Sequence, residues 1–92
     1  MTLEEEKQEP RLVFPCEFPL KVIGVNEDGF ADYAVEVVHR HVPDLDHRSI
    51  SHTVSEGGKY MSVSFMFMAK SREQVDNLYR ELTASKRVKW VL

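Results

Sequence analysis

The stretch GGKYMSVSFMFM, residues 57–68, decides how this chain folds. Gly57-Gly58 is typical of a two-residue hairpin turn, because glycine readily adopts the positive φ angles that such turns require. The residues that follow alternate between two faces, as they do along a β-strand. One of these faces is entirely apolar and carries Met61, Val63, Phe65 and Phe67. We therefore predict a strand over residues 60–68 that forms one arm of a hairpin and buries one face.

The other arm of the hairpin is expected at about residues 47–55, before the turn. Its apolar residues are few, since Ile50 and Val54 share a face with Arg48 and His52, and the opposite face is polar. A strand with no strongly apolar face is typical of the edge of a sheet.

Two further segments carry apolar residues at helical spacing, which predicts one helix before the hairpin and one after it. The first runs from Phe30 until Pro43 ends it. Its apolar stripe is Phe30, Ala34, Val37 and Val38. The second is preceded by SREQ, residues 71–74, which is a capping box with Ser71 at the helix start. The stripe of this second helix is Val75, Leu78, Tyr79 and Leu82.

The segments that flank this pattern predict two more strands. LKVIGV, residues 20–25, is rich in β-branched residues, and Pro15 and Pro19 before it favour extended backbone. KRVKWVL, residues 86–92, alternates. It places Val88, Trp90 and Leu92 on one face and Arg87, Lys89 and Val91 on the other.

The resulting order, βαββαβ, is that of the ferredoxin-like α+β fold, a four-stranded antiparallel sheet with two helices on one face. Right-handed crossovers place the strands at residues 20–25 and 60–68 in the centre. We predict a single domain over residues 12–92, preceded by a flexible acidic tail over residues 1–11. The side of the sheet that faces the helices is expected to carry Leu20, Val22, Val63, Phe65, Phe67, Val88 and Leu92.

Several stretches resemble the YbeD-like family of small uncharacterised bacterial proteins. The most specific is FPCEFPLKVIG, residues 14–24, and the segments at 35–41, 58–64 and 74–82 agree with it. The resemblance implies a ferredoxin-like fold similar to the ACT-type regulatory domains, which bind amino acids at dimer interfaces. It implies no catalytic residue, because the family has no established activity.

The size and charge of the chain exclude several classes of function. With 92 residues, a formal net charge of −3 and one cysteine, it has room for one modest core, no global basic field for nucleic acid and no intramolecular disulfide. The N-terminal residues lack a secretory signal, and no apolar run approaches the roughly 20 residues that span a bilayer. We therefore expect a cytoplasmic protein with no membrane partner.

No catalytic, metal or cofactor site is predicted. Cys16 lies between two prolines, without the base and oxyanion group that a nucleophile needs, and a packing role is expected. His39 and His41 point about 200° apart on a regular helix. His47 and His52 would face opposite ways on a strand, so neither pair can chelate a metal ion.

Two surfaces remain as candidate binding sites. The side of the sheet away from the helices, here called the open sheet face, is expected to present an interface. Its predicted residues are Ile23, Val25, Tyr60, Met66, Met68 and Val91. A contiguous apolar surface favours a homodimer or a protein partner. The alternative site is the turn before the first helix, where the resemblance to ACT-type domains makes Asn26, Asp28 and Gly29 candidates for binding a small molecule such as an amino acid.

RNA binding is a third and weaker hypothesis. Sheets of this fold bind RNA through aromatic side chains on the two central strands. Tyr60 is expected to face outward, but Ser62 stands where a second ring is needed. We predict a non-catalytic regulatory or adaptor module that acts through protein association on the open sheet face.

Overall fold

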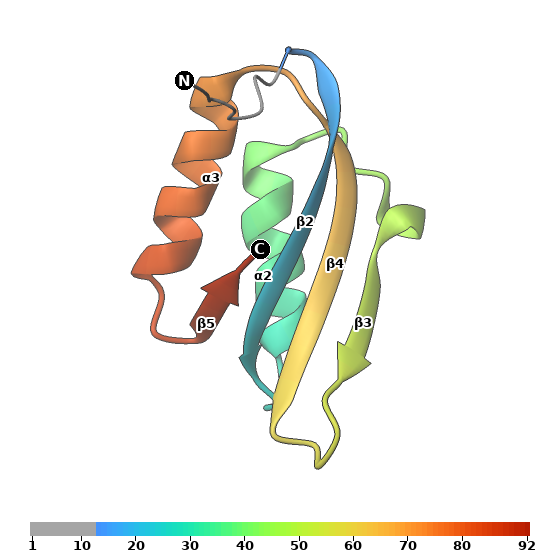
Figure 1. Cartoon of the computed structure of the whole chain (residues 1–92), viewed down its shortest axis with the longest axis vertical. Coiled ribbons are helices and arrows are strands. Elements are labelled where there is room, and N and C mark those ends of the chain that lie inside the picture. Colours follow the sequence, from blue (N-terminus) through green and yellow to red (C-terminus); the bar gives the residue numbers. More distant parts are fainter. Residues whose placement is uncertain (1–12) are drawn as a thin grey trace, which may run out of the picture.

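A computed structural model describes residues 13–92 and shows the predicted order of strands and helices (Figure 1). The elements are β2 (Cys16–Val25), α2 (Phe30–His41), the 3-10 helix η1 (His47–Ser49), β3 (Ser51–Val54), β4 (Tyr60–Ala69), α3 (Arg72–Ala84) and β5 (Val88–Val91). The four strands form one antiparallel sheet in the order β3-β4-β2-β5, so β2 and β4 lie in the centre as predicted. With both helices packed on one face, this is the ferredoxin-like α+β fold. The predicted tail, residues 1–11, lies outside the described residues.

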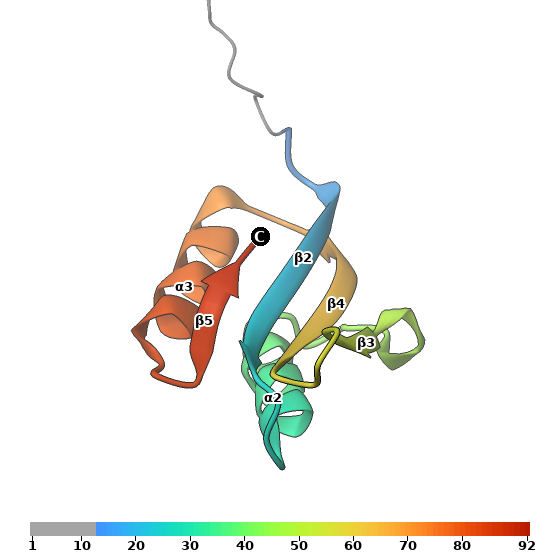
Figure 2. The same ribbon diagram turned by 60° about the horizontal axis from the view of Figure 1, so that its bottom comes forward.

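The two central strands pair along their whole length, in ten consecutive rungs. β5 borders only the second half of β2 (Figure 2), as far as a pair of backbone hydrogen bonds of 3.0 and 2.8 Å between Lys21 and Leu92. Pro19 lies two residues before Lys21, so its nitrogen faces the side that β5 does not reach. Its missing N–H therefore costs no ladder hydrogen bond, which explains how proline fits inside a central strand.

The core fills the space between the sheet and the two helices. Leu20, Val22, Val63, Phe65 and Phe67 are buried there as predicted. The predicted helix stripes join them, with Phe30, Ala34, Val37 and Val38 from α2 and Val75, Leu78 and Leu82 from α3. Val88 is half-buried against this cluster. Leu92, however, is 66% exposed, so its predicted place in the core is wrong.

The error at Leu92 comes from a β-bulge in β5. The rungs between the two strands are Val22↔Val91, Ile23↔Trp90 and Gly24↔Val88. Lys89 is therefore an extra residue, and one extra residue moves every side chain after it to the other face of the sheet. Val91 consequently packs against the core, and its predicted place on the open sheet face is wrong. Trp90 lies there instead and is 52% exposed.

Gly24 lies at the bulge, where its neighbours leave no room for a side chain. Its Cα lies so close to the carbonyl oxygen of Arg87 and to the ring of Phe30 that a Cβ atom would overlap both. The Phe30 ring is fully buried and fills the space that a side chain would otherwise occupy. Glycine is needed here for close approach of the backbone to its neighbours.

The edge strand is shorter than predicted, because residues 47–49 form a 3-10 helix instead of extending β3. The carboxylate of Asp46 accepts a 3.0 Å hydrogen bond from the backbone N–H of Arg48 and so caps this turn. The hydroxyl of Ser49 donates to the carbonyl oxygen of Met66 at 3.0 Å, which ties the turn to β4. Only four residues remain for β3, and all four are exposed, as is typical of a short edge strand.

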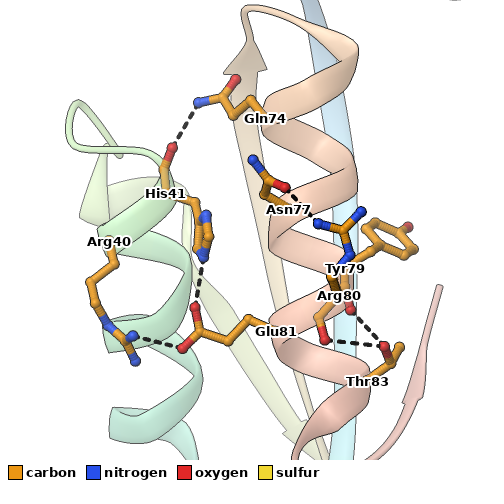
Figure 3. A network of polar contacts seen from close by, with 8 residues as sticks. All are labelled: Arg40, His41, Gln74, Asn77, Tyr79, Arg80, Glu81 and Thr83. Carbon is orange, nitrogen blue, oxygen red and sulfur yellow. Dashed lines mark hydrogen bonds and ion pairs between the residues drawn. The ribbon is translucent and has the colours of Figure 1, made fainter.

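A polar network joins the two helices (Figure 3). The Glu81 carboxylate on α3 accepts a hydrogen bond of 2.7 Å from the His41 ring and forms an ion pair of 2.6 Å with the Arg40 guanidinium. His41 and Arg40 both lie on α2. The side-chain amide of Gln74 donates to the His41 carbonyl oxygen at 2.8 Å. The hydrogen bond from His41, and after it the charge of Arg40, hold the pKa of the Glu81 carboxyl below its usual value.

Candidate functional site

The open sheet face carries most of the residues that the sequence predicts for an interface. On the central strands its rungs are Glu17 with Met68, Pro19 with Met66, Lys21 with Ser64, Ile23 with Ser62 and Val25 with Tyr60. The predicted residues that lie here are Ile23, Val25, Tyr60, Met66 and Met68. Val91, on the core side, is replaced by Trp90 and Leu92 from β5.

One half of this face is an apolar surface, the methionine patch, which we define as Pro19, Met66, Met68 and Leu92. The two methionines are 43% and 44% exposed. A hollow of about 460 Å³ is bordered by Pro19, Met66 and Leu92 among others. Exposed apolar side chains that gather around a concavity are typical of an interaction surface.

Charged residues flank the methionine patch in a regular arrangement. Glu17 lies two residues before Pro19 on β2, and Lys21 lies two residues after it, so all three share the open sheet face. Both charged side chains are on exposed residues. The patch therefore has an acidic end and a basic end, placed symmetrically about the rung of Pro19 and Met66.

The other half of the face is a cluster of rings, the aromatic corner, which we define as Tyr60, Trp90 and Lys59. The two rings lie 5.3 Å apart between centroids with an interplanar angle of 69°. The Lys59 ammonium lies 5.5 Å from the centroid of the Tyr60 ring, within range of a cation–π contact. A second hollow, of about 300 Å³, is bordered by both rings.

The turn predicted to bind a small molecule is held by contacts within the chain. The Asn26 side-chain amide donates to the carbonyl oxygen of Gly58 at 2.9 Å, which ties this turn to the hairpin. Gly29 has a φ of +84° and begins α2 in the left-handed region that glycine favours. The Arg87 guanidinium approaches the carbonyl oxygen of Asp28 at 3.4 Å. Asn26 and Gly29 thus have structural roles, and ligand binding at this turn stays a prediction.

The remaining candidate groups do not assemble into a reactive centre. Across residues 13–92, no three His, Cys, Asp or Glu side chains come together as a metal site requires. Cys16 is half-buried at the start of β2. His39 and His47 come together as an edge-to-face ring pair with centroids 5.5 Å apart. In the part of the chain that the structure describes, no helix is long and apolar enough to cross a membrane.

Trp90, Leu92 and Lys59 are the site residues that sequence reasoning missed. Strict alternation from Val88 assigns Trp90 and Leu92 to the same face as Val88, whereas the bulge separates them from it. A signal was present, because an isolated glycine inside a strand pattern, here Gly24, indicates a bulge or a close backbone approach.

Comparison with known structures identifies the class of fold. The ACT domain from the GTP pyrophosphokinase of Chlorobium tepidum superposes with a TM-score of 0.63 at 17% identity, over 83% of this chain and 84% of that one. Protein HP0495 from Helicobacter pylori gives a TM-score of 0.67 at 13% identity, over 95% of this chain and 91% of that one. The protein has an ACT-like ferredoxin fold.

Comparison of sequences identifies the family. The model of the family described as "Protein of unknown function (DUF493)" matches residues 9–92, and the chain belongs to this family. A UPF0250 protein of Azotobacter vinelandii is 41% identical over 90 residues, which is 97% of this chain and 98% of that protein. A UPF0250 protein of Chromobacterium violaceum is also 41% identical over 90 residues, 98% of this chain and all of that protein. The family carries no assigned catalytic activity.

Proposed function

We propose that the protein is a non-catalytic regulatory module that works as a homodimer, in which the methionine patches of two copies pack face to face. The observation that carries this proposal is the exposure of Met66 and Met68, at 43% and 44%, together with a hollow of about 460 Å³ that Met66 borders. Methionine adapts its shape to an irregular partner surface, which suits it to such an interface. The ACT-like fold supports a regulatory role, because the ACT-type domains that it resembles are regulatory domains.

The arrangement of charge favours a second copy as the occupant. A two-fold symmetric interface needs a surface that is complementary to itself. If the two-fold axis runs across the strands at the rung of Pro19 and Met66, it places Glu17 of each copy opposite Lys21 of the other. Each charged residue would then meet an opposite charge, and the apolar side chains between them would meet one another.

Light scattering coupled to size-exclusion chromatography tests the dimer. We expect wild-type protein to elute with twice the 10.7 kDa chain mass at micromolar concentration. Glu17→Lys and Lys21→Glu each replace two ion pairs by two like-charge contacts, so each should weaken the dimer by roughly tenfold or more. The double variant Glu17→Lys/Lys21→Glu restores opposite charges and should recover the dimer.

Arg72→Glu provides the matched control. It reverses one charge on α3, where the Arg72 guanidinium makes an exposed 3.9 Å ion pair with Asp76 away from the open sheet face, and it should leave the dimer intact. A wild-type protein that stays monomeric at high concentration contradicts the proposal. A dimer that survives both single reversals, or that the double variant fails to recover, assigns the interface to another surface.

A further inference from the structure

We infer that the aromatic corner binds a nucleotide, either free or as part of a single RNA strand. The sequence predicts only one outward ring for stacking, at Tyr60 on a central strand. The bulge in β5 adds a second ring from the neighbouring edge strand, because it brings Trp90 to the open sheet face beside Tyr60. Aromatic pairs on an exposed sheet are the usual platform on which proteins stack nucleobases.

The geometry of the two rings leaves a flat surface available. They meet edge to face, at 69°, so the contact between them covers one face of only one ring. Trp90 is 52% exposed, which leaves its indole open to a planar group from solvent. The adjoining hollow of about 300 Å³ is at the lower end of the volumes of ligand pockets, which matches a single base better than a larger ligand.

The polar groups around the hollow suit the remaining parts of a nucleotide. Thr53 and Ser55 border it with hydroxyl groups from the hairpin. The Ser55 oxygen already accepts a 3.0 Å hydrogen bond from the backbone N–H of Tyr60, which leaves its O–H free to donate to a base or ribose oxygen. Lys21 also borders the hollow, and none of the described side chains that line it is acidic.

Charge distinguishes a nucleotide from an uncharged aromatic ligand. The protein as a whole is negative, with a formal net charge of −3. The charged side chains at the aromatic corner are positive, because Lys59 lies over the Tyr60 ring and Lys21 borders the hollow. Within residues 13–92 neither lysine forms an ion pair. A ring that carries a phosphate satisfies both the stacking surface and the two cations.

Trp90 is the one tryptophan of the chain, so its fluorescence reports directly on stacking at the site. The protein is titrated with uridine monophosphate, with adenosine monophosphate and with a ten-residue oligouridylate, and with inorganic phosphate as a control without a base. We expect saturable quenching by the probes that contain a base and none by phosphate alone. Tyr60→Leu should weaken binding roughly fivefold or more, the loss of affinity typical of one stacking contact.

The dependence on salt tests the lysines. For a single strand that contacts two cations, the logarithm of the binding constant should fall with the logarithm of salt concentration with a slope of about −1.4, and of about −0.7 in Lys59→Gln. Arg72→Gln, a neutralisation on α3, is the matched control and should keep the wild-type slope. Thermal unfolding of each variant establishes that it is folded before binding is compared.

The outcomes separate the sources of the nucleotide and the alternatives. Equal affinity for the monophosphates and for the oligonucleotide supports a free nucleotide, and much tighter binding of the oligonucleotide supports RNA. Absence of quenching by every probe overturns the inference, as does binding that Tyr60→Leu and Lys59→Gln leave unchanged. Failure of the dimer and failure of nucleotide binding are distinguished by Glu17→Lys, because Glu17 flanks the methionine patch and does not border the hollow of the aromatic corner, whereas Lys21 borders that hollow.

Discussion

Replacement of Gly24 by alanine tests whether close packing at this glycine sets the path of β5. The added Cβ atom would overlap the carbonyl oxygen of Arg87 and the ring of Phe30. The Phe30 side chain is fully buried by the core, so it has no solvent-filled space into which to move. The carbonyl oxygen belongs to the backbone just before β5, so relief requires the whole strand to shift.

The expected loss follows from these contacts. Extra methylene groups forced into a packed core cost about 1 to 3 kcal/mol, and two simultaneous overlaps place Gly24→Ala near the top of that range, at about 3 kcal/mol. A domain of this size has a total stability of roughly 5 to 14 kcal/mol, so the variant should still fold. The midpoint of thermal unfolding should fall by roughly 10 to 20 °C.

Urea denaturation followed by Trp90 fluorescence measures this effect, because Trp90 lies on the strand that must move. Gly58→Ala is the control, since its Cβ would meet nothing within 4 Å and the substitution acts only through the positive φ of 77°. Its cost should be about 1 kcal/mol. A loss below about 0.5 kcal/mol in Gly24→Ala would refute the reasoning, because the strand would then have room for a side chain there.

Two further predictions concern the helices. The lowered pKa of Glu81 means that its contribution to stability is present above its unfolded pKa of about 4.3 and is lost as pH falls through the still lower folded value. Glu81→Gln should therefore lower the free energy of unfolding at pH 7 by about 1 kcal/mol. Chemical denaturation at pH 7 and at pH 3 measures this, and the difference in free energy between the variant and wild type should be smaller at pH 3. An equal difference at both pH values would contradict the prediction. Ser71→Ala removes the hydroxyl that accepts a 3.1 Å hydrogen bond from the Gln74 backbone N–H and should cost about 1 kcal/mol in urea denaturation, with Ser71→Asp keeping the cap and the stability.

The fold was predictable because local patterns agree with the overall architecture. The alternation along β4 and the helical stripes that start at Phe30 and Val75 each bury one face, and each is buried in the structure. The cap at Ser71 was predictable for the same reason, since the Ser71 side chain accepts from the Gln74 backbone N–H as a capping box requires. Gln74 differs from the prediction. In a capping box its side chain would accept from the backbone N–H of Ser71, whereas here it accepts from the backbone N–H of Lys70.

The errors arose where tertiary contacts override a local pattern. At the bulge, Gly24 packs closely against Phe30, and nothing within residues 86–92 records that contact. The 3-10 helix at 47–49 depends on Asp46, whose side chain competes for the backbone N–H of Arg48. The first of these errors altered the candidate site, because the bulge exchanged Val91 for Trp90 on the open sheet face.

The unequal lengths of the strand pairings have a consequence for amide hydrogen exchange. β2 and β4 share ten rungs, whereas β3 shares four with β4 and β5 shares three with β2. Amides protected by few rungs exchange through small local openings, while those in the longest pairing exchange only when the whole domain unfolds. The amides of the central ribbon should thus be the last to exchange. Those of β5, which carries the bulge and Trp90, should exchange early enough for a bound ligand to slow them measurably.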